Sequence, residues 1–201
     1  LGLDSCFEDL DNPIELFKNW FTKAEEKEIN DPNAVAVATS DKHNQPNVRM
    51  VLLKGLSDRG FVFYTNFNSK KGGELKINQK ASMCFHWKSL RRQVRVVGKV
   101  EEVTSKEADD YYNSRPYKNR ISAWASSQSQ ILDKRETFLK KIKEYEKKYP
   151  DENNVPRPSH WSGWRLLPDE IEFWVDGEGR IHERLNYKNS NGKWVKEILY
   201  P

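Results

Sequence analysis

Residues 180–184, Arg-Ile-His-Glu-Arg, bring three nitrogen-rich side chains together near the C-terminus. If this stretch is a β-strand, the alternation of side chains places Arg180, His182 and Arg184 on one face, over about 13 Å. Two guanidinium groups and an imidazole in one row repel one another unless an anion lies against them. The row therefore predicts a binding wall for an anionic, planar ligand, and a solvated strand face is the alternative interpretation.

A second set of cations flanks the run 49–54, Arg-Met-Val-Leu-Leu-Lys. Four consecutive apolar residues predict a strand that is buried on both faces. Arg49 and Lys54 stand at positions of opposite parity, so they point to opposite sides of the sheet. They could contact two separate phosphate groups, Arg49 as a bidentate fork and Lys54 as a point charge. The alternative is a strand whose two ends reach solvent.

A third candidate anion site lies at the start of a predicted short helix. Ser69 predicts the helix cap, and Lys70 and Lys71 fall in the first turn, where positive charge opposes the helix dipole. A phosphate bound at this N-terminus would relieve the conflict. A pair of surface lysines is the alternative.

Two further patterns combine cations with hydrogen-bonding or aromatic groups. Gln93 shares one face of a predicted strand with Arg91 and Arg95. Tyr111 and Arg115 are four residues apart and therefore adjacent on a predicted helix. An exposed sheet edge and an arginine at a helix C-terminus explain the two patterns without a ligand. Taken together, the separated cations suit two phosphorylated planar ligands better than one polyanion.

Other chemistries find little support in the sequence. The spacing of His43, His86 and His160 predicts no metal site, and Cys6 with Cys84 makes no disulfide framework. The glycine-rich dinucleotide-binding and P-loop patterns are absent. A net charge of +4 permits anionic ligands but argues against a nucleic-acid-binding module, because the cations are scattered among apolar strands.

The chain contains 201 residues and has no apolar run of the ~18 residues that a membrane helix needs. We expect a cytoplasmic protein without a membrane partner. Leu1 is not a natural start, so we expect the natural protein to begin earlier.

Hydrophobic periodicity predicts short strands with helices inserted between groups of them. Asn12, Pro13 and Glu15 predict a capped helix start, and Thr104 with Glu107 predicts another capping box. The expected strands span residues 34–39, 48–54, 60–66, 81–87, 93–103, 161–167, 171–175, 180–188 and 193–200. The further expected helices span residues 69–78, 104–114, 119–127 and 133–149. This order favours an antiparallel barrel with peripheral helices over a doubly wound parallel sheet.

We predict a single domain over residues 1–201. Its parts are an N-terminal helix segment (1–32), the first barrel strands (33–104), a helical insertion (105–150) and the C-terminal strands (160–201). Asn191-Gly192 predicts a tight hairpin between the last two strands.

The same segments, in the same order, resemble the pyridoxamine 5′-phosphate oxidase family. The resemblance rests on seven motifs: Arg49-Met-Val-Leu-Leu-Lys54, Phe63-Tyr-Thr-Asn66, Arg92-Gln-Val94, Tyr111 with Ser114-Arg-Pro116, Gln128-Ser129, Glu172-Phe-Trp174 and Arg180-Ile-His182. One such motif would mean little, whereas seven in order are specific. The resemblance implies an antiparallel, Greek-key-like split β-barrel that forms a homodimer and holds FMN at the subunit interface.

The resemblance also implies which residues bind. The FMN contacts would be Arg49, Met50, Val51, Leu52, Leu53, Lys54, Tyr64, Thr65, Lys70, Lys71, Gln93, Gln128, Ser129, Trp174 and Arg184. The substrate contacts would be Lys54, Tyr111, Arg115 and Asn119 around its phosphate, with Arg180, Ile181 and His182 near its ring. Arg180 and His182 would be the catalytic residues, and no metal is implied.

The implied activity is oxidation of pyridoxamine and pyridoxine 5′-phosphates to pyridoxal 5′-phosphate, with hydride transfer to FMN and O₂ as final acceptor. A flavin protein of the same fold with another substrate, or without catalysis, is the alternative. The sequence departs from the family pattern at four positions and has no clear match to its N-terminal arm. Lys70 and Ile198 replace arginine, Asn119 replaces serine, and Glu183 replaces aspartate.

Overall fold

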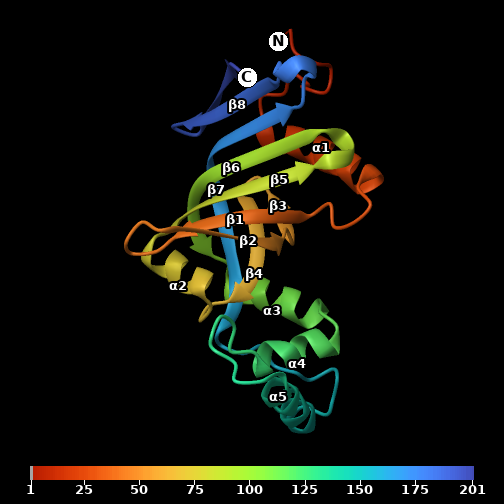
Figure 1. Ribbon diagram of the computed structural model, residues 1–201, viewed down its shortest axis with the longest axis vertical. Helices are drawn as coiled ribbons and strands as arrows, with labels where there is room; N and C mark the ends of the chain where they lie inside the picture. The colour runs from red at the N-terminus through yellow and green to blue at the C-terminus, as the bar shows by residue number, and fades with distance from the viewer. Residues whose placement is uncertain (1) are drawn as a thin grey trace.

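The computed structural model describes residues 2–201, which form one antiparallel sheet of nine strands with helices around it (Figure 1). The strands are β1 (Ala34–Ser40), β2 (Pro46–Leu52), β3 (Gly55–Ser57), β4 (Gly60–Asn66), β5 (Lys80–Trp87), β6 (Arg92–Glu102), β7 (Trp161–Val175), β8 (Glu183–Ser190) and β9 (Lys193–Leu199). The helices are α1 (Pro13–Lys27), α2 (Lys70–Ile77), α3 (Ser105–Ser114), α4 (Tyr117–Ala125) and α5 (Arg135–Lys148). Two short 3₁₀ turns, η1 (Lys88–Leu90) and η2 (Glu178–Arg180), complete the set.

The strand order along the sheet is β2-β1-β5-β6-β7-β4-β3, and β8 and β9 continue from β7. All pairings are antiparallel, and the sheet curls into a half-barrel, which confirms the predicted split-barrel class. The long strand β7 pairs with β6, and on its other edge with β4 first and then with β8. One strand therefore connects the helical end of the molecule to the C-terminal hairpin (Figure 1).

The continuity of β7 corrects the sequence prediction of two separate strands, 161–167 and 171–175. The ladder between β6 and β7 shifts register between Val97 and Gly98, opposite the segment from Pro168 to Glu170. A Cβ atom on Gly98 would lie 1.9 Å from the Leu167 carbonyl oxygen, so only glycine permits this approach. Pro168 interrupts the strand pattern in the sequence, but the shift in register accommodates it within one continuous strand.

A second correction concerns Arg180 and His182, which do not lie on a strand. Arg180 ends the turn η2 with a positive φ of 68°, and Gly179 before it has a φ of 65°. The strand begins only at Glu183, so the predicted row of Arg180, His182 and Arg184 on one strand face does not form. A turn with positive φ at Gly179 and Arg180 forms here in place of the start of the predicted strand.

The prediction that β2 is buried on both faces is also wrong for the single chain. The strand lies at one end of the sheet, and Val48 and Met50 are 69% and 62% exposed. Leu52 on the same face is 38% exposed. An edge strand with an exposed apolar face is a ready surface for another chain.

The core lies between the curled sheet and α1. Phe17 and Trp20 of α1 are buried, and the ring of Phe17 meets those of Phe61 and Phe85 edge-on at 4.9 Å and 5.0 Å. Burying a side chain of this size stabilises the fold by about 2 to 3 kcal/mol. At the start of α1 the Asn12 side chain accepts a hydrogen bond from the N–H of Ile14, so the cap is a single bond instead of the predicted reciprocal pair.

The local turn and cap signals are confirmed elsewhere. Thr104 and Glu107 form the reciprocal capping box at the start of α3. Asn191 and Gly192 both adopt positive φ, as a tight hairpin between β8 and β9 requires.

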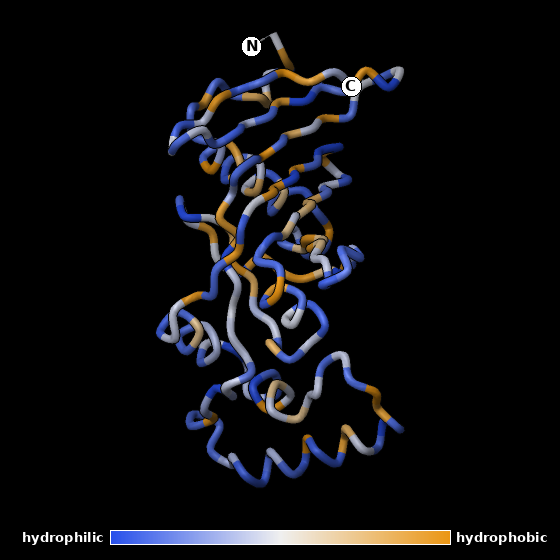
Figure 2. The backbone as a smooth tube through the Cα atoms, turned by 90° about the vertical axis from the view of Figure 1, so that its left-hand side faces the viewer, coloured by the Kyte–Doolittle hydropathy of each residue, from blue (hydrophilic) through white to orange (hydrophobic). Residues whose placement is uncertain are grey.

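Helices α3, α4 and α5 gather at one end of the molecule (Figure 1). Figure 2 shows that α5 is mostly hydrophilic, whereas hydrophobic residues concentrate along the central strands. Among the described residues, no helix is both long and apolar enough to cross a membrane.

Candidate active site

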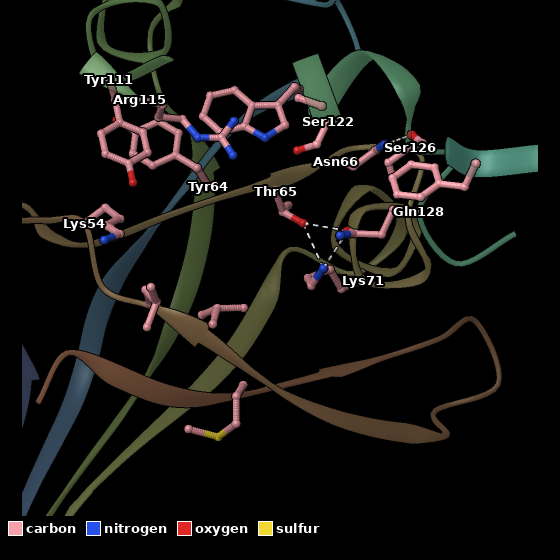
Figure 3. Close-up of a pocket in the computed structure, with 16 residues that line it drawn as sticks. Lys54, Tyr64, Thr65, Asn66, Lys71, Tyr111, Arg115, Ser122, Ser126 and Gln128 are labelled. Atoms are coloured by element: carbon pink, nitrogen blue, oxygen red, sulfur yellow. Dashed lines mark hydrogen bonds between the residues drawn. The ribbon is translucent and has the colours of Figure 1, made fainter. Parts of the chain in front are cut away.

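A cleft of about 410 Å³ lies between the sheet and the helical end of the chain (Figure 3). Strands β2 and β4 form one wall, and α3, α4 and the loop after α4 form the other. The lining residues are Met50, Val51, Leu52, Lys54, Tyr64, Thr65, Asn66, Lys71, Tyr111, Arg115, Ser122, Ala123, Ser126, Gln128, Phe138 and Trp161. Many residues predicted from separate segments of the sequence thus meet in one place.

Three aromatic rings stack at one end of the cleft. The ring of Tyr64 lies 4.1 Å from that of Tyr111 and 5.3 Å from that of Trp161, with interplanar angles of 21° and 7°. The guanidinium carbon of Arg115 lies 4.7 Å from the centre of the Trp161 ring. Cation–π contact holds the flat face of this arginine and leaves its N–H groups available.

Arg115 is the cation of the cleft that most needs a partner. Its Nη1 atom is buried and has no hydrogen-bond partner among the described residues. Burial lowers the pKa of Arg115, because the charged guanidinium has lost part of its hydration. Such a group is costly unless an anion occupies the adjoining space, so Arg115 predicts a phosphate or carboxylate there.

A second cation, Lys71, stands on the sheet side of the same cleft. Its Nζ donates to Thr65 Oγ1 at 2.8 Å and to Gln128 Oε1 at 3.0 Å, as the dashed lines in Figure 3 show. Burial, with a smaller contribution from nearby Arg49, lowers the pKa of Lys71 to about 8, and Glu74 opposes the shift. Both of its hydrogen-bond partners are neutral, so a negative ligand would raise the pKa of Lys71 toward its ordinary value.

The loop that presents Lys70 and Lys71 is shaped by a cap and a close approach. Ser69 accepts a hydrogen bond from the N–H of Gly72, which fixes the start of α2. A Cβ atom on Gly72 would lie 2.4 Å from the carbonyl oxygen of Phe67. Glycine therefore lets the chain fold back tightly enough to point the N-terminus of α2 toward the cleft.

Arg49 and Lys70 do not line the cleft but lie beside it. Arg49 donates to Glu74 Oε2 at 3.2 Å and to the carbonyl oxygen of Val37 at 3.2 Å. Lys70 donates to Asn47 Oδ1 at 3.0 Å. The predicted anion-binding set of Arg49, Lys70 and Lys71 is thus gathered at one end of α2 and β2.

The other predicted site residues form a separate group at the far end of β7. Gln93, Trp174 and Arg184 occupy neighbouring register positions on β6, β7 and β8. Arg184 Nε donates to the buried Glu172 at 2.9 Å. Along β7, Trp161 at the helical end of the cleft and Trp174 are 13 positions apart, which spans about 40 Å in an extended strand. Within one chain, this group is therefore well separated from the aromatic end of the cleft.

His182 and Arg180 belong to this second group. The imidazole of His182 packs 4.7 Å from the Trp174 ring, and its Nδ1 lies 3.2 Å from both the Gly177 N–H and Asp176 Oδ1. Without a proton, Nδ1 accepts from Gly177; with a proton, it pairs with the carboxylate. Arg180 is exposed in the turn beside it.

Some predicted residues stand apart from both groups, and some lining residues were not predicted. Asn119, Ser129 and Ile181 are exposed, and Leu53 is buried in the core. No sequence pattern indicates Ser122, Ser126 and Trp161 as cleft residues, because they reach the cleft only through tertiary packing. A group of three or more His, Cys, Asp or Glu side chains placed to hold a metal ion does not occur in the described part of the chain.

The fold and the cleft define a split-barrel protein that has two separated cation sets and aromatic walls suited to flat, phosphorylated ligands. The chain belongs to the pyridoxamine 5′-phosphate oxidase family. The family model described as pyridoxamine 5′-phosphate oxidase matches residues 21–149. The model of the pyridoxine 5′-phosphate oxidase C-terminal dimerisation region matches residues 161–201.

Known proteins agree with this assignment. The chain is 60% identical over 202 residues to the pyridoxine/pyridoxamine 5′-phosphate oxidase of Pelagibacter ubique, covering 100% of this chain and 97% of the relative. It is 54% identical to the enzyme of the same name from Agrobacterium fabrum, covering 100% and 98%. A crystal structure of PhzG from Burkholderia lata, in complex with tetrahydrophenazine-1-carboxylic acid, superposes with a TM-score of 0.92 at 28% identity, covering 100% of this chain and 98% of that one.

Proposed function

We propose that this chain is an FMN-dependent oxidase that converts pyridoxamine and pyridoxine 5′-phosphates to pyridoxal 5′-phosphate. The observation that carries the proposal is the pairing, in one cleft, of Arg115, which lies beside an aromatic stack and whose buried Nη1 has no partner among residues 2–201, with Lys71, whose pKa burial lowers, on the opposite side. Two anion sites on either side of flat aromatic walls suit two phosphorylated ring compounds. The names of relatives that share 54% to 60% identity supply the chemical identity of those compounds.

The residues around α2 fit the FMN phosphate. Lys71 would bind it directly, and Arg49 and Lys70 would add charge from the flank of the cleft. Thr65 and Gln128, which hold Lys71, would contact the cofactor beside its phosphate. The depressed pKa of Lys71 is the structural sign of fit, because an arriving dianion reverses it.

The helical side of the cleft fits the substrate phosphate. Arg115 Nη1 would donate to a phosphate oxygen, Tyr111 would donate its hydroxyl, and Lys54 would contribute charge from the opposite wall. Ser122, one turn beyond the exposed Asn119 on α4, lines the cleft and is placed to take the hydrogen bond that the family resemblance assigns to Asn119. Fixing both phosphates sets the two rings face to face, which makes the reaction effectively unimolecular.

Bound FMN would supply the acceptor for a hydride from the C4′ carbon of the substrate, with O₂ as the final two-electron acceptor that becomes hydrogen peroxide. Pyridoxine phosphate then loses the hydroxyl proton and gives the aldehyde, whereas pyridoxamine phosphate gives an imine that water hydrolyses to the aldehyde and ammonia. Arg180 and His182 would orient the substrate ring, and His182 Nδ1 can exchange its partner between Gly177 N–H and the Asp176 carboxylate as it gains a proton. Arg184 would stabilise negative charge on the reduced flavin.

The enzyme would act as a homodimer with FMN between the subunits. Trp174 and the aromatic end of the cleft lie about 40 Å apart along β7 in one chain, so these two groups could serve one ligand only across a subunit boundary. The exposed apolar face of β2 and the match to a dimerisation region over residues 161–201 support such a boundary.

The test is a visible spectrum of the purified protein under nitrogen. We expect flavin absorbance that bleaches on addition of pyridoxamine 5′-phosphate and returns when air is admitted. Protein that stays colourless with added FMN would exclude flavin binding. A bound flavin that does not bleach would favour the alternative, a same-fold protein with another substrate, for which the likeness to PhzG provides a precedent in fold.

A further inference from the structure

Glu74 is a buried carboxylate that the proposed chemistry leaves without a role. It lies in the middle of α2, is 4% exposed, and stands one turn after Lys70 and Lys71. An ionised side chain is kept in such a place only when several donors compensate for its lost hydration. The donors that surround Glu74 therefore indicate what it does.

Three side chains donate to this carboxylate. Oε1 accepts from Asn47 Nδ2 at 2.7 Å. Oε2 accepts from Arg49 Nη2 at 3.2 Å and from the Thr39 hydroxyl in a short hydrogen bond. The donors come from β1 and β2, so Glu74 connects the helix that carries the lysines to the strand that carries Arg49.

The network continues from Asn47 to Lys70. Asn47 donates through Nδ2 to Glu74 and accepts through Oδ1 from Lys70 at 3.0 Å, so both ends of its amide are used. Arg49 is further fixed by Nη1, which donates to the carbonyl oxygens of Val37 and Asn47 at 3.2 Å and 3.3 Å. One carboxylate thus orients two of the three cations at this end of the cleft.

The charge balance of the group matches a phosphate monoester. Arg49, Lys70 and Lys71 carry three positive charges and Glu74 carries one negative charge, which leaves two. A phosphate monoester carries about −1.5 to −2 at neutral pH. The opposing influences of Arg49 and Glu74 on the pKa of Lys71 show that all three groups lie within electrostatic reach of one another.

We propose that Glu74 is a positioning residue for the FMN phosphate, holding Arg49 directly and Lys70 through Asn47. The inference rests on the proposed function, in which this end of the cleft binds FMN. It also accounts for Lys70 at a position where the family usually has arginine. A lysine lacks the planar fork, and the hydrogen bond to Asn47 supplies the missing orientation.

Charge and position predict opposite effects for Glu74→Gln, which makes the test decisive. If Glu74 acted only as a charge, its neutralisation would strengthen phosphate binding. If it positions Arg49 and Lys70, glutamine places its NH2 group against either Arg49 or Asn47 and releases that partner. We expect the dissociation constant for FMN to rise about tenfold. Riboflavin lacks the phosphate, so we expect its dissociation constant to change less than twofold.

The experiment titrates the apoprotein, freed of flavin, with FMN and with riboflavin and follows flavin fluorescence. Asn47→Ala disconnects Lys70 from Glu74 and keeps the direct contact between Glu74 and Arg49. We therefore expect a smaller weakening of FMN binding and none for riboflavin, and this variant also covers the case in which Glu74→Gln fails to fold. Lys76→Gln removes a charge from the same helix outside the network and is the matched control; we expect unchanged binding.

FMN binding that is unchanged or tighter in both Glu74→Gln and Asn47→Ala would overturn the inference, and so would an equal loss of FMN and riboflavin. These results concern the role of Glu74 alone, as long as the wild-type protein binds FMN. Wild-type protein that binds neither flavin would instead refute the proposed function, and the inference with it.

Discussion

Arg165 on β7 and Glu107 on α3 form an ion pair that joins α3 to the centre of the sheet. Arg165 is 5% exposed and also donates to Glu101 at 3.2 Å. Tyr111 follows Glu107 by four residues on the same helix, and Arg115 caps the C-terminus of α3 four residues later. The ion pair therefore sets the position of the two residues that would bind the substrate phosphate.

Glu107→Gln should raise the KM for pyridoxamine 5′-phosphate about fivefold to tenfold, a loss of about 1 to 1.4 kcal/mol of binding. Glutamine at this position still completes the capping box with Thr104, so the substitution removes the charge pair and keeps the helix start. Because the proposed flavin site lies on the sheet side, kcat and FMN affinity should change less than twofold. Steady-state kinetics would check this, with Lys106→Gln as the control on the same turn. A fall in kcat at constant KM would contradict the positioning role.

The same pair gives the protein a pH-dependent contribution to stability. Hydrogen bonds from the Thr104 backbone and from Arg165 lower the pKa of Glu107 from 4.5 to about 2. A depressed carboxyl pKa stabilises the fold above the unfolded value, and this contribution is lost as the pH falls from about 4.5 toward 2. Glu107 is partly exposed, so its effect should stay below about 1 kcal/mol.

Urea unfolding of wild type and Glu107→Gln should therefore differ at pH 7, and the difference should shrink by about half at pH 3, because the pKa of Glu107 in the folded protein is about 2. Other carboxylates titrate alike in both proteins and cancel in the difference. A gap in the free energy of unfolding that persists unchanged at pH 3 would show that the carboxylate charge is not its source.

Lys71 should make FMN binding sensitive to alkaline pH. Its pKa of about 8 means that the apoprotein loses this positive charge as the pH rises through 8. A bound phosphate dianion favours the protonated amine, so the dissociation constant for FMN should rise by up to tenfold between pH 8 and pH 9. Fluorescence titration of wild type and Lys71→Gln would test this. The variant should bind more weakly at pH 7 but without that slope, and an identical slope in both proteins would assign the effect to another group.

Local signals in the sequence predicted the parts of the structure that local physics controls. The capping box of Thr104 and Glu107 and the Asn191-Gly192 hairpin need only neighbouring residues, and both formed as expected. The turn at Gly179 and Arg180 failed for the opposite reason. Alternating side chains predict a strand that begins at residue 180. Gly179 and Arg180 instead adopt positive φ, which residue periodicity does not predict, and the strand begins only at Glu183.

The sequence pattern did not predict contacts between residues that are distant along the chain. Trp161 begins a strand, and nothing local indicates that its ring stacks on Tyr64 and supports Arg115 from β7. Likewise, the apolar run in β2 predicts a buried strand, but the strand lies at the edge of its own sheet and is exposed in the single chain. The prediction would hold only if another chain covered β2. Family resemblance identified most of the cleft residues, whereas composition and spacing alone left each patch with a plain structural alternative.

Arg115→Ala should raise the KM for the phosphorylated substrate about 10- to 100-fold, because hydrogen bonds between charged groups are strong and the remaining phosphate ligands cannot replace the lost Nη1. Arg115→Lys should recover part of this loss through its charge. FMN affinity should be unchanged in both variants. Steady-state kinetics with pyridoxamine 5′-phosphate provides the measurement, and an unchanged KM in the alanine variant would remove Arg115 from the substrate site.

Arg180→Ala should cut turnover about 100-fold while FMN is retained, because Arg180 would orient the substrate ring and not the cofactor. The side chain is exposed in a turn, so its removal leaves the core intact. Glu178→Gln, in the same turn, is the matched control and should leave turnover within twofold. The flavin content after gel filtration and kcat in air would be measured together for each protein. Replacing a residue that held FMN would lower flavin content and turnover in proportion. Equal losses of both in Arg180→Ala would therefore assign Arg180 to the cofactor site instead of the substrate site.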